Sequence, residues 1–150
     1  MSRPAERKAA AAFAGYVLED QIGFVLRKAQ QRATAIFLSH FGRHQITPTQ
    51  WTTLVRILEH GSLSQNHLGR LTAMDPATIQ GVVQRLIERK LITRIADPDD
   101  RRRKRLGLTA AGQRLVQRLI ANAVTVSRDT LRPLTKREQA LVHDLLERLG

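Results

Sequence analysis

The sequence predicts a mostly α-helical fold that carries one small β-hairpin. Apolar residues recur at helical spacing over long stretches, and the 150 residues include only 9 glycines and 5 prolines. One short β-prone segment, Leu91–Ile95, is followed by a turn and a second apolar stretch at 106–108. A chain of this length is expected to form a single domain, residues 1–150. Its core should be mainly aliphatic, because only 4% of the residues are aromatic.

The charge of the chain limits its partners. A formal net charge of +12 implies a polyanion, namely nucleic acid or an anionic membrane. No apolar run reaches the roughly 18 residues of a membrane span, and the first residues lack the apolar core of a secretory signal. A cytoplasmic protein without a membrane partner is therefore expected. The chain has no cysteine, which excludes disulfides, thiolate zinc sites and a peroxide-sensing thiol.

The first long helix is predicted from about Val17 to Ser39, where apolar residues keep the helical period. These residues are Ile22, Val25, Leu26, Ala29, Ala33, Ile36 and Phe37. His40 and His44 follow at the four-residue spacing of a helical metal pair, but Gly42 lies between them and no third ligand is near. We expect solvated or hydrogen-bonded histidines here, with a metal-sensing pair as the alternative, and we predict no metal site and no cofactor.

A second helix is predicted from Thr47 to His60. Thr47 is a good N-cap, with Pro48 at the first helical position and Gln50 at the third, which together form a capping box. Gly61 ends the helix. Its predicted apolar face consists of Trp51, Leu54, Val55 and Leu58.

Two short helices joined by a tight turn follow. Ser64 caps the first, and Asp75 caps the second, which runs to about Arg89 with Pro76 at its first position. The inward face of the second helix is apolar at positions Ile79, Val82, Val83, Leu86 and Ile87.

The other face of this second helix carries hydrogen-bonding residues and few carboxylates. They are Thr78, Gln80, Gly81, Gln84 and Arg85. Helix-turn-helix proteins lay a face of this kind in the major groove of DNA. An ordinary amphipathic helix with a solvated face is the alternative. Near the start of the preceding helix, Ser64 and Gln65, with Asn66 and Arg70, are candidates for contacts with phosphates.

The predicted hairpin has a basic tip. Pro98 lies among three aspartates and makes the turn, and five consecutive cations, 101–105, come next. A basic finger neutralises phosphates or inserts arginine into a narrow minor groove, and Arg101, Arg102 and Arg103 are our candidates for this role. A solvated charge run is the alternative. The position beside a candidate recognition helix favours a DNA-binding wing.

Two further helices complete the chain. Thr109 caps the first, which Pro133 ends, and Thr135 with Glu138 forms a capping box for the last. The last helix is expected to bury Leu141, Leu145 and Leu149. The apolar surface of these helices is wide for one small domain and suits a subunit interface.

Several short motifs resemble those of the MarR family of transcriptional regulators. Asp97-Pro98, Asp100-Arg101-Arg102 and Leu108–Gly112 match the D-P-x-D-R-R…L-T-x-x-G signature of the family wing. Thr47–Trp51 and Leu86–Leu91 resemble the start of its second helix and the end of its recognition helix. The resemblance covers roughly residues 17–149. Lys90 stands where the family usually has glycine, so we expect the helix to end there without a left-handed cap.

The resemblance implies a winged helix-turn-helix at about 47–109, flanked by dimerisation helices at about 13–45 and 109–149. It further implies a homodimer whose recognition helices enter successive major grooves of a pseudo-palindrome, about 34 Å apart. A repressor released from DNA by a small ligand is expected. The elements that would line the ligand pocket carry Arg27, Arg32, His40, His44 and Trp51. Cations there suit a carboxylate or a CoA phosphate, so an aromatic acid or its acyl-CoA thioester is favoured. Plain surface charges are the alternative.

The sequence gives no sign of an enzyme. It contains no glycine-rich phosphate loop, no H-E-x-x-H motif and no G-x-S-x-G nucleophile elbow. The remaining alternative is a nonspecific nucleoid-type DNA-binding protein that works through charge alone and has no effector.

Overall fold

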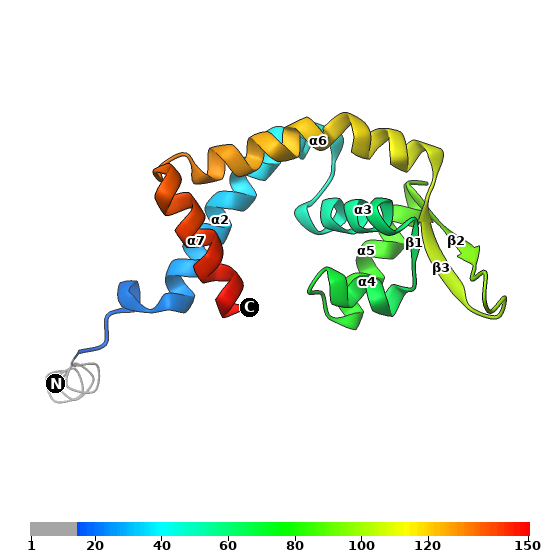
Figure 1. Ribbon diagram of the computed structural model, residues 1–150, viewed down its shortest axis with the longest axis horizontal. Helices are drawn as coiled ribbons and strands as arrows, with labels where there is room; N and C mark the ends of the chain where they lie inside the picture. Colours follow the sequence, from blue (N-terminus) through cyan, green and yellow to red (C-terminus); the bar gives the residue numbers. More distant parts are fainter. Residues whose placement is uncertain (1–14) are drawn as a thin grey trace, which may run out of the picture. The chain divides into compact units, whose positions relative to one another are not determined.

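The computed structural model describes residues 15–150 (Figure 1). These residues fall into two compact units, one ending at Ala33 and one comprising Thr34–Gly150. The first unit contains a 3-10 turn, η1 (Leu18–Asp20), and most of helix α2 (Ile22–Phe41). The predicted helical start at Val17 is wrong, because Gln21 has an extended backbone and α2 begins after it. Ile22, Val25 and Leu26 are exposed within their unit.

The second unit contains the short helices that the capping residues predict. They are α3 (Pro48–His60), α4 (Gln65–Leu71) and α5 (Pro76–Glu88). Thr47 and Gln50 form the expected capping box at the start of α3. The side chains of Ser64 and Asp75 accept hydrogen bonds from the first turns of α4 and α5. Each cap satisfies a backbone N–H group that the helix itself leaves unpaired.

A three-stranded antiparallel sheet lies beside these helices, in the order β1 (Ser62–Leu63), β3 (Lys104–Leu108) and β2 (Ile92–Ala96). The hairpin of β2 and β3 is the predicted one, with Ile92 opposite Leu108. The sequence analysis missed β1, because two residues are too few to show an alternating pattern. We call residues 92–108 the wing.

The core joins the short helices, the sheet and the first half of α6 (Ala110–Leu131). The inner face of α3 differs from the prediction, because Leu58 is exposed while Gln50 and Thr53 are buried. The Thr53 hydroxyl donates to the Thr49 carbonyl, so its burial leaves no unpaired group. Fully buried side chains of this core include Leu54, Ile57, Leu68, Ile79, Leu86, Ile92, Val116 and Leu119.

The last two helices are α6 and α7 (Lys136–Leu149), and both begin at the predicted caps, Thr109 and Thr135. The expected burial of Leu141, Leu145 and Leu149 is wrong for a single chain, since all three are exposed. Within residues 15–150 no residue of α7 is buried, and only Gln139 and Val142 are half-buried. The mostly helical fold with a small hairpin is nevertheless confirmed. No helix within residues 15–150 is long and apolar enough to cross a membrane.

Candidate DNA interface

Helix α5 divides into a buried face and a polar face, as predicted. Ile79, Val82, Val83 and Leu86 are buried. Thr78, Gln80, Gln84 and Arg85 are exposed, and Gly81 is half-buried among them. Nothing lies within 4 Å of the position that a Cβ of Gly81 would take, so the packing of this chain does not require glycine there.

Local hydrogen bonds already engage two of these polar side chains. The Thr78 hydroxyl donates to Asp75 Oδ2 at 2.6 Å, and the Thr78 N–H donates to Asp75 Oδ1 at 2.8 Å. These two bonds, with the hydroxyl contributing most, lower the pKa of the Asp75 carboxyl below its usual value. Gln84 Nε2 donates to Glu88 Oε1 at 3.0 Å. Gln80 and Arg85 make no side-chain hydrogen bond within residues 15–150, which leaves their donors open to a ligand.

Helix α5 ends differently from our expectation. Lys90 adopts a left-handed backbone with φ 57°, although it is not glycine. The Leu91 N–H donates to the Leu86 carbonyl at 3.0 Å and the Lys90 N–H to the Ile87 carbonyl at 2.8 Å. This pair of bonds is the Schellman motif. The expectation that Lys90 prevents a left-handed cap is therefore wrong, because the two bonds and the buried Leu91 hold the residue there.

Aspartates fix the geometry of the wing. The Asp97 carboxylate accepts from the Asp99 N–H at 2.9 Å, and Asp100 Oδ1 accepts from the Arg102 N–H at 3.0 Å. Asp100 also lies 3.5 Å from Arg103 Nε. The acidic residues of the D-P-x-D-R-R signature thus build the turn and hold one arginine of the wing.

The cationic run is not all at the tip. Arg101, Arg102 and Arg103 occupy the turn and are exposed, whereas Lys104 and Arg105 lie in strand β3. Arg105 is half-buried in β3 opposite Ile95, where it donates to the Ser62 carbonyl at 2.6 Å and lies 3.8 Å from Asp97. The tip therefore has three cations, and Arg105 instead ties β3 to β1.

The start of α4 lies next to the wing. A hollow of about 390 Å³ is lined by Ser64, Gln65, Asn66, Arg103 and Lys104. The structure therefore brings together three of the four predicted phosphate-contact residues, Ser64, Gln65 and Asn66, and one predicted wing arginine. Charge and hydrogen-bonding capacity in one hollow suit an anionic oxygen of a nucleic-acid backbone.

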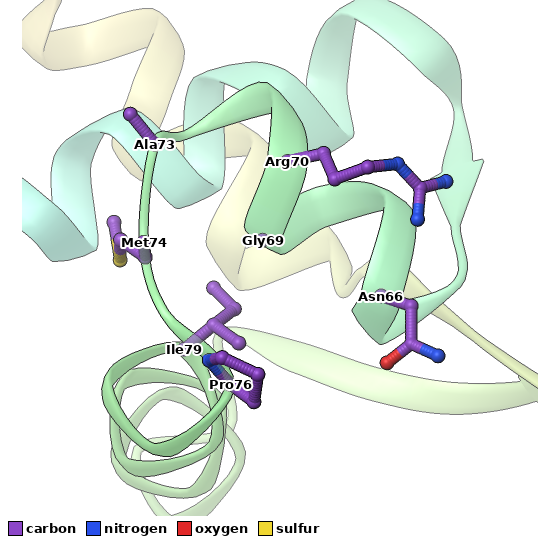
Figure 2. Close-up of a pocket in the computed structure, with 7 residues that line it drawn as sticks. All are labelled: Asn66, Gly69, Arg70, Ala73, Met74, Pro76 and Ile79. Atoms are coloured by element: carbon purple, nitrogen blue, oxygen red, sulfur yellow. The ribbon is translucent and has the colours of Figure 1, made fainter.

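The sequence analysis gave no sign of a second pocket, of about 410 Å³, between α4 and the start of α5 (Figure 2). Its lining is Asn66, Gly69, Arg70, Ala73, Met74, Pro76 and Ile79. Figure 2 shows Asn66 and Arg70 projecting from the same side of α4. Asn66 and Arg70 extend the polar surface of α4 toward α5.

The five candidate ligand-binding residues are divided between the two units. Arg27 and Arg32 lie on α2 in the first unit and are exposed there, whereas His40, His44 and Trp51 belong to the second. Trp51 is half-buried, with its ring edge-on to Phe41 at 5.0 Å between centroids.

The two histidines have separate partners. His40 Nε2 pairs with Asp129 Oδ2 at 3.1 Å, and the Asn122 amide donates to the His40 carbonyl at 3.0 Å. Arg43 Nε donates to His44 Nε2 at 3.2 Å. Burial, and then repulsion by Arg43 and Arg118, lowers the pKa of His44. Among residues 15–150, no group of three or more His, Cys, Asp or Glu could hold a metal ion.

Comparisons with known proteins agree with this geometry. A family model described as MarR family matches residues 44–103. The transcriptional repressor NicR of Pseudomonas putida is 38% identical over 134 residues, which cover 89% of this chain and 85% of NicR.

Solved structures extend the likeness to the fold. The crystal structure of a probable transcriptional regulator from Pseudomonas aeruginosa has a TM-score of 0.85 and 51% identity, covering 89% of this chain and 100% of that one. The Bordetella bronchiseptica protein BpsR, whose DNA binding is regulated by 6-hydroxynicotinic acid, has a TM-score of 0.84 and 33% identity, covering 89% and 96%. With its winged fold and these relatives, the chain belongs to the MarR family and is a transcriptional regulator of the MarR type.

Proposed function

We propose that this regulator is a homodimeric repressor that binds a pseudo-palindromic operator and is released from it by a small anionic aromatic acid. The acyl-CoA thioester of such an acid is the second ligand class that we consider. The observation that carries the proposal is the exposed polar face of α5, where Gln80 and Arg85 have open donors, beside a wing whose tip holds three exposed arginines.

In this proposal α5 enters the major groove. Thr78, Gln80, Gly81, Gln84 and Arg85 contact base edges, Arg101, Arg102 and Arg103 serve the wing, and Ser64 and Gln65 contact the backbone. Glutamine pairs bidentately with adenine and arginine with guanine, each worth about 1–3 kcal/mol of discrimination. Gln80→Ala and Arg85→Ala should each relax specificity at one operator position. Lys136→Ala, which removes an exposed cation from the first turn of α7, is the matched control.

Those variants are measured by fluorescence anisotropy on a set of single-base operator mutants. If Gln80→Ala and Arg85→Ala weaken every sequence equally, they contact the backbone instead, and the base-reading roles are withdrawn.

The exposed leucines of α7 support the homodimer. Leu141, Leu145 and Leu149 are 54%, 44% and 69% exposed and lie one helical turn apart. A second copy of the chain would remove this surface from water. Sedimentation of the wild type should give a dimer and Leu145→Asp a monomer. A wild type that sediments as a monomer at micromolar concentration contradicts the proposal.

The effector class rests on charge and on relatives. Arg27, Arg32, His40, His44 and Trp51 supply cations, imidazoles and an aromatic surface, which suit an aromatic carboxylate. The similarity to BpsR, at 33% identity, makes 6-hydroxynicotinic acid the first compound to test.

Calorimetric titration should give saturable one-site binding of at least one aromatic acid, and Arg32→Met should weaken it. Binding of the CoA thioester alone would select the second ligand class. No heat from either class would discard the effector while leaving DNA binding intact.

A nonspecific nucleoid-type protein is the competing function, and the net charge of +12 favours it. Salt separates the two, because charge-driven binding falls steeply with ionic strength on every sequence. A specific regulator keeps a preference of about 10³ or more for its operator at physiological salt.

A further inference from the structure

We infer that Arg89 is a positioning residue that couples the recognition helix α5 to the loop between α2 and α3, so that DNA binding and the state of this loop control one another. The inference rests on the proposed function. We call residues 42–46 the α2–α3 loop.

The contact itself joins distant parts of the second unit. Arg89 caps the C-terminal end of α5. Its guanidinium Nη1 donates to the Gln45 carbonyl and its Nη2 donates to the His44 carbonyl at 3.0 Å. These partners lie 44 and 45 positions earlier in the chain. A planar guanidinium that serves two consecutive carbonyls fixes their orientation as well as their distance.

The loop that receives these bonds has a defined shape. It begins with the 3-10 turn η2 (Gly42–His44), and Gln45 follows with a left-handed backbone of φ 54°. The Gln45 N–H donates to the Gly42 carbonyl at 3.0 Å, and Ile46 is buried in the core. Arg89 thus supplies donors to two exposed carbonyls at the end of this turn, in the place that water would otherwise take.

The end of α5 is held rigidly on its other side. The Thr109 hydroxyl donates to the Lys90 carbonyl at 2.7 Å, and the Thr109 N–H donates to the Leu91 carbonyl at 3.1 Å. A Cβ on Gly112 would lie 2.0 Å from the Leu91 oxygen, so α6 approaches this junction without spare room. Residues 89–91 and the start of α6 are therefore expected to move as one body, so a displacement of the loop relative to them must act on the Arg89 bonds.

The loop also carries a residue of the proposed effector site. His44 is one of the two residues whose carbonyls Arg89 holds, and α3, with Trp51, starts just beyond the loop. Displacing one carbonyl by about 1 Å breaks a hydrogen bond of this geometry. Ligand-induced movement of the loop would therefore reach the end of α5, and by thermodynamic linkage DNA on α5 would stabilise the loop.

Amide hydrogen exchange on the full chain tests this coupling from the DNA side and needs no effector. The wild type, Arg89→Met and Lys90→Met are each measured alone and with a duplex of the gene's own upstream region. Arg89→Met keeps the length of the side chain and removes both donors. Lys90→Met removes the same charge one residue later, from an exposed side chain that makes no hydrogen bond or ion pair within residues 15–150, so it is the matched control.

We expect DNA to slow exchange in the α2–α3 loop by about tenfold or more in the wild type and in Lys90→Met, but by less than about threefold in Arg89→Met. A merely structural role for Arg89 predicts faster exchange with and without DNA and an unchanged ratio between the two, and that result overturns the inference. Protection of α5 without protection of the loop in the wild type overturns it as well, although the DNA-binding proposal then survives. If the wild type does not bind the duplex selectively, both the inference and the DNA-binding proposal are contradicted.

Discussion

Three residues other than glycine adopt a left-handed backbone within residues 15–150, and each follows a helical segment. They are Gln45 after η2, Ala73 after α4 and Lys90 after α5, with φ between 52° and 57°. This conformation costs an L-residue roughly 1–2 kcal/mol, because its Cβ crowds the following carbonyl. One of these residues lies in the α2–α3 loop and two follow α4 and α5. All three are in parts of the chain that the proposed function uses.

Lys90→Gly should stabilise the protein. Glycine relieves the left-handed strain and leaves the two backbone bonds of the Schellman motif in place. We expect a gain of about 1 kcal/mol, which for a chain of this size raises Tm by about 2–4 °C. Thermal unfolding followed by circular dichroism measures it. Lys90→Ala is the control, since it keeps a Cβ and should give no comparable gain. Equal Tm values for all three proteins would contradict the strain argument.

Gly112→Ala should do the opposite. Its new Cβ would collide with the Leu91 carbonyl oxygen, which is main chain and cannot rotate away. We expect a loss of more than about 2 kcal/mol in the free energy of unfolding, as is usual for overpacking at a fixed contact. Denaturant titration gives this value. The same change at Gly81, where the space is open, should instead stabilise α5 by up to about 1 kcal/mol. If Gly112→Ala behaves like Gly81→Ala, the close approach of α6 to Leu91 is wrong.

At the scale of the element, capping carboxylates link the stability of α5 to pH. The bonds from Thr78 lower the pKa of Asp75 in the folded state. A group with a lowered folded pKa contributes stability above its unfolded pKa and loses it as the pH falls through the folded value. Asp75→Asn keeps a capping oxygen but not the charge.

The denaturation midpoint of the wild type should therefore exceed that of Asp75→Asn at pH 7. The difference should shrink below about pH 4, where aspartate begins to protonate. Denaturant titrations at pH 7, 5 and 3 provide the comparison. A difference that is the same at all three values would show that the charge contributes nothing.

The wing gives a test at the same scale. Arg102 contributes only its main-chain N–H to the turn, through Asp100, and its side chain is exposed. Arg102→Ala should weaken operator binding by more than tenfold, a loss of about 1.4 kcal/mol or more, and leave Tm unchanged. Anisotropy titrations against Lys136→Ala separate the loss of a contact from the loss of net charge. An unchanged affinity would remove Arg102 from the interface.

The sequence predicted where the helices begin better than it predicted which of their faces are buried. Caps such as Thr47, Ser64, Asp75, Thr109 and Thr135 mark helix starts because their chemistry is local, and all five begin helices. Strand β1 was missed because it depends on pairing with residues more than forty positions away. The prediction of the inner face of α3 was wrong because the Thr53 hydroxyl finds its hydrogen-bond acceptor within its own helix. Thr53 can therefore be buried like an apolar residue.

At the scale of the whole molecule, the sequence pattern predicts one part of the candidate site, and the other part depends on contacts between residues far apart in the chain. The polar face of α5 and the basic turn of the wing were visible as patterns of residue type. The roles of Arg105 and Arg89 were not, because each depends on main-chain carbonyls that the fold brings from far along the chain. The exposed leucines of α7 are a further example. Their spacing predicts that this face is buried, but it does not predict which part of the protein, or which partner, covers it.

Selective operator binding is the central claim for the assembled molecule, and a mobility shift tests it most directly. The protein is titrated at physiological salt onto the upstream region of its own gene and onto a random duplex, with and without 6-hydroxynicotinic acid. We predict a preference for the upstream region of about 10³ or more, which the acid reduces. Equal binding to both duplexes would contradict the account and leave a protein that recognises DNA through charge alone.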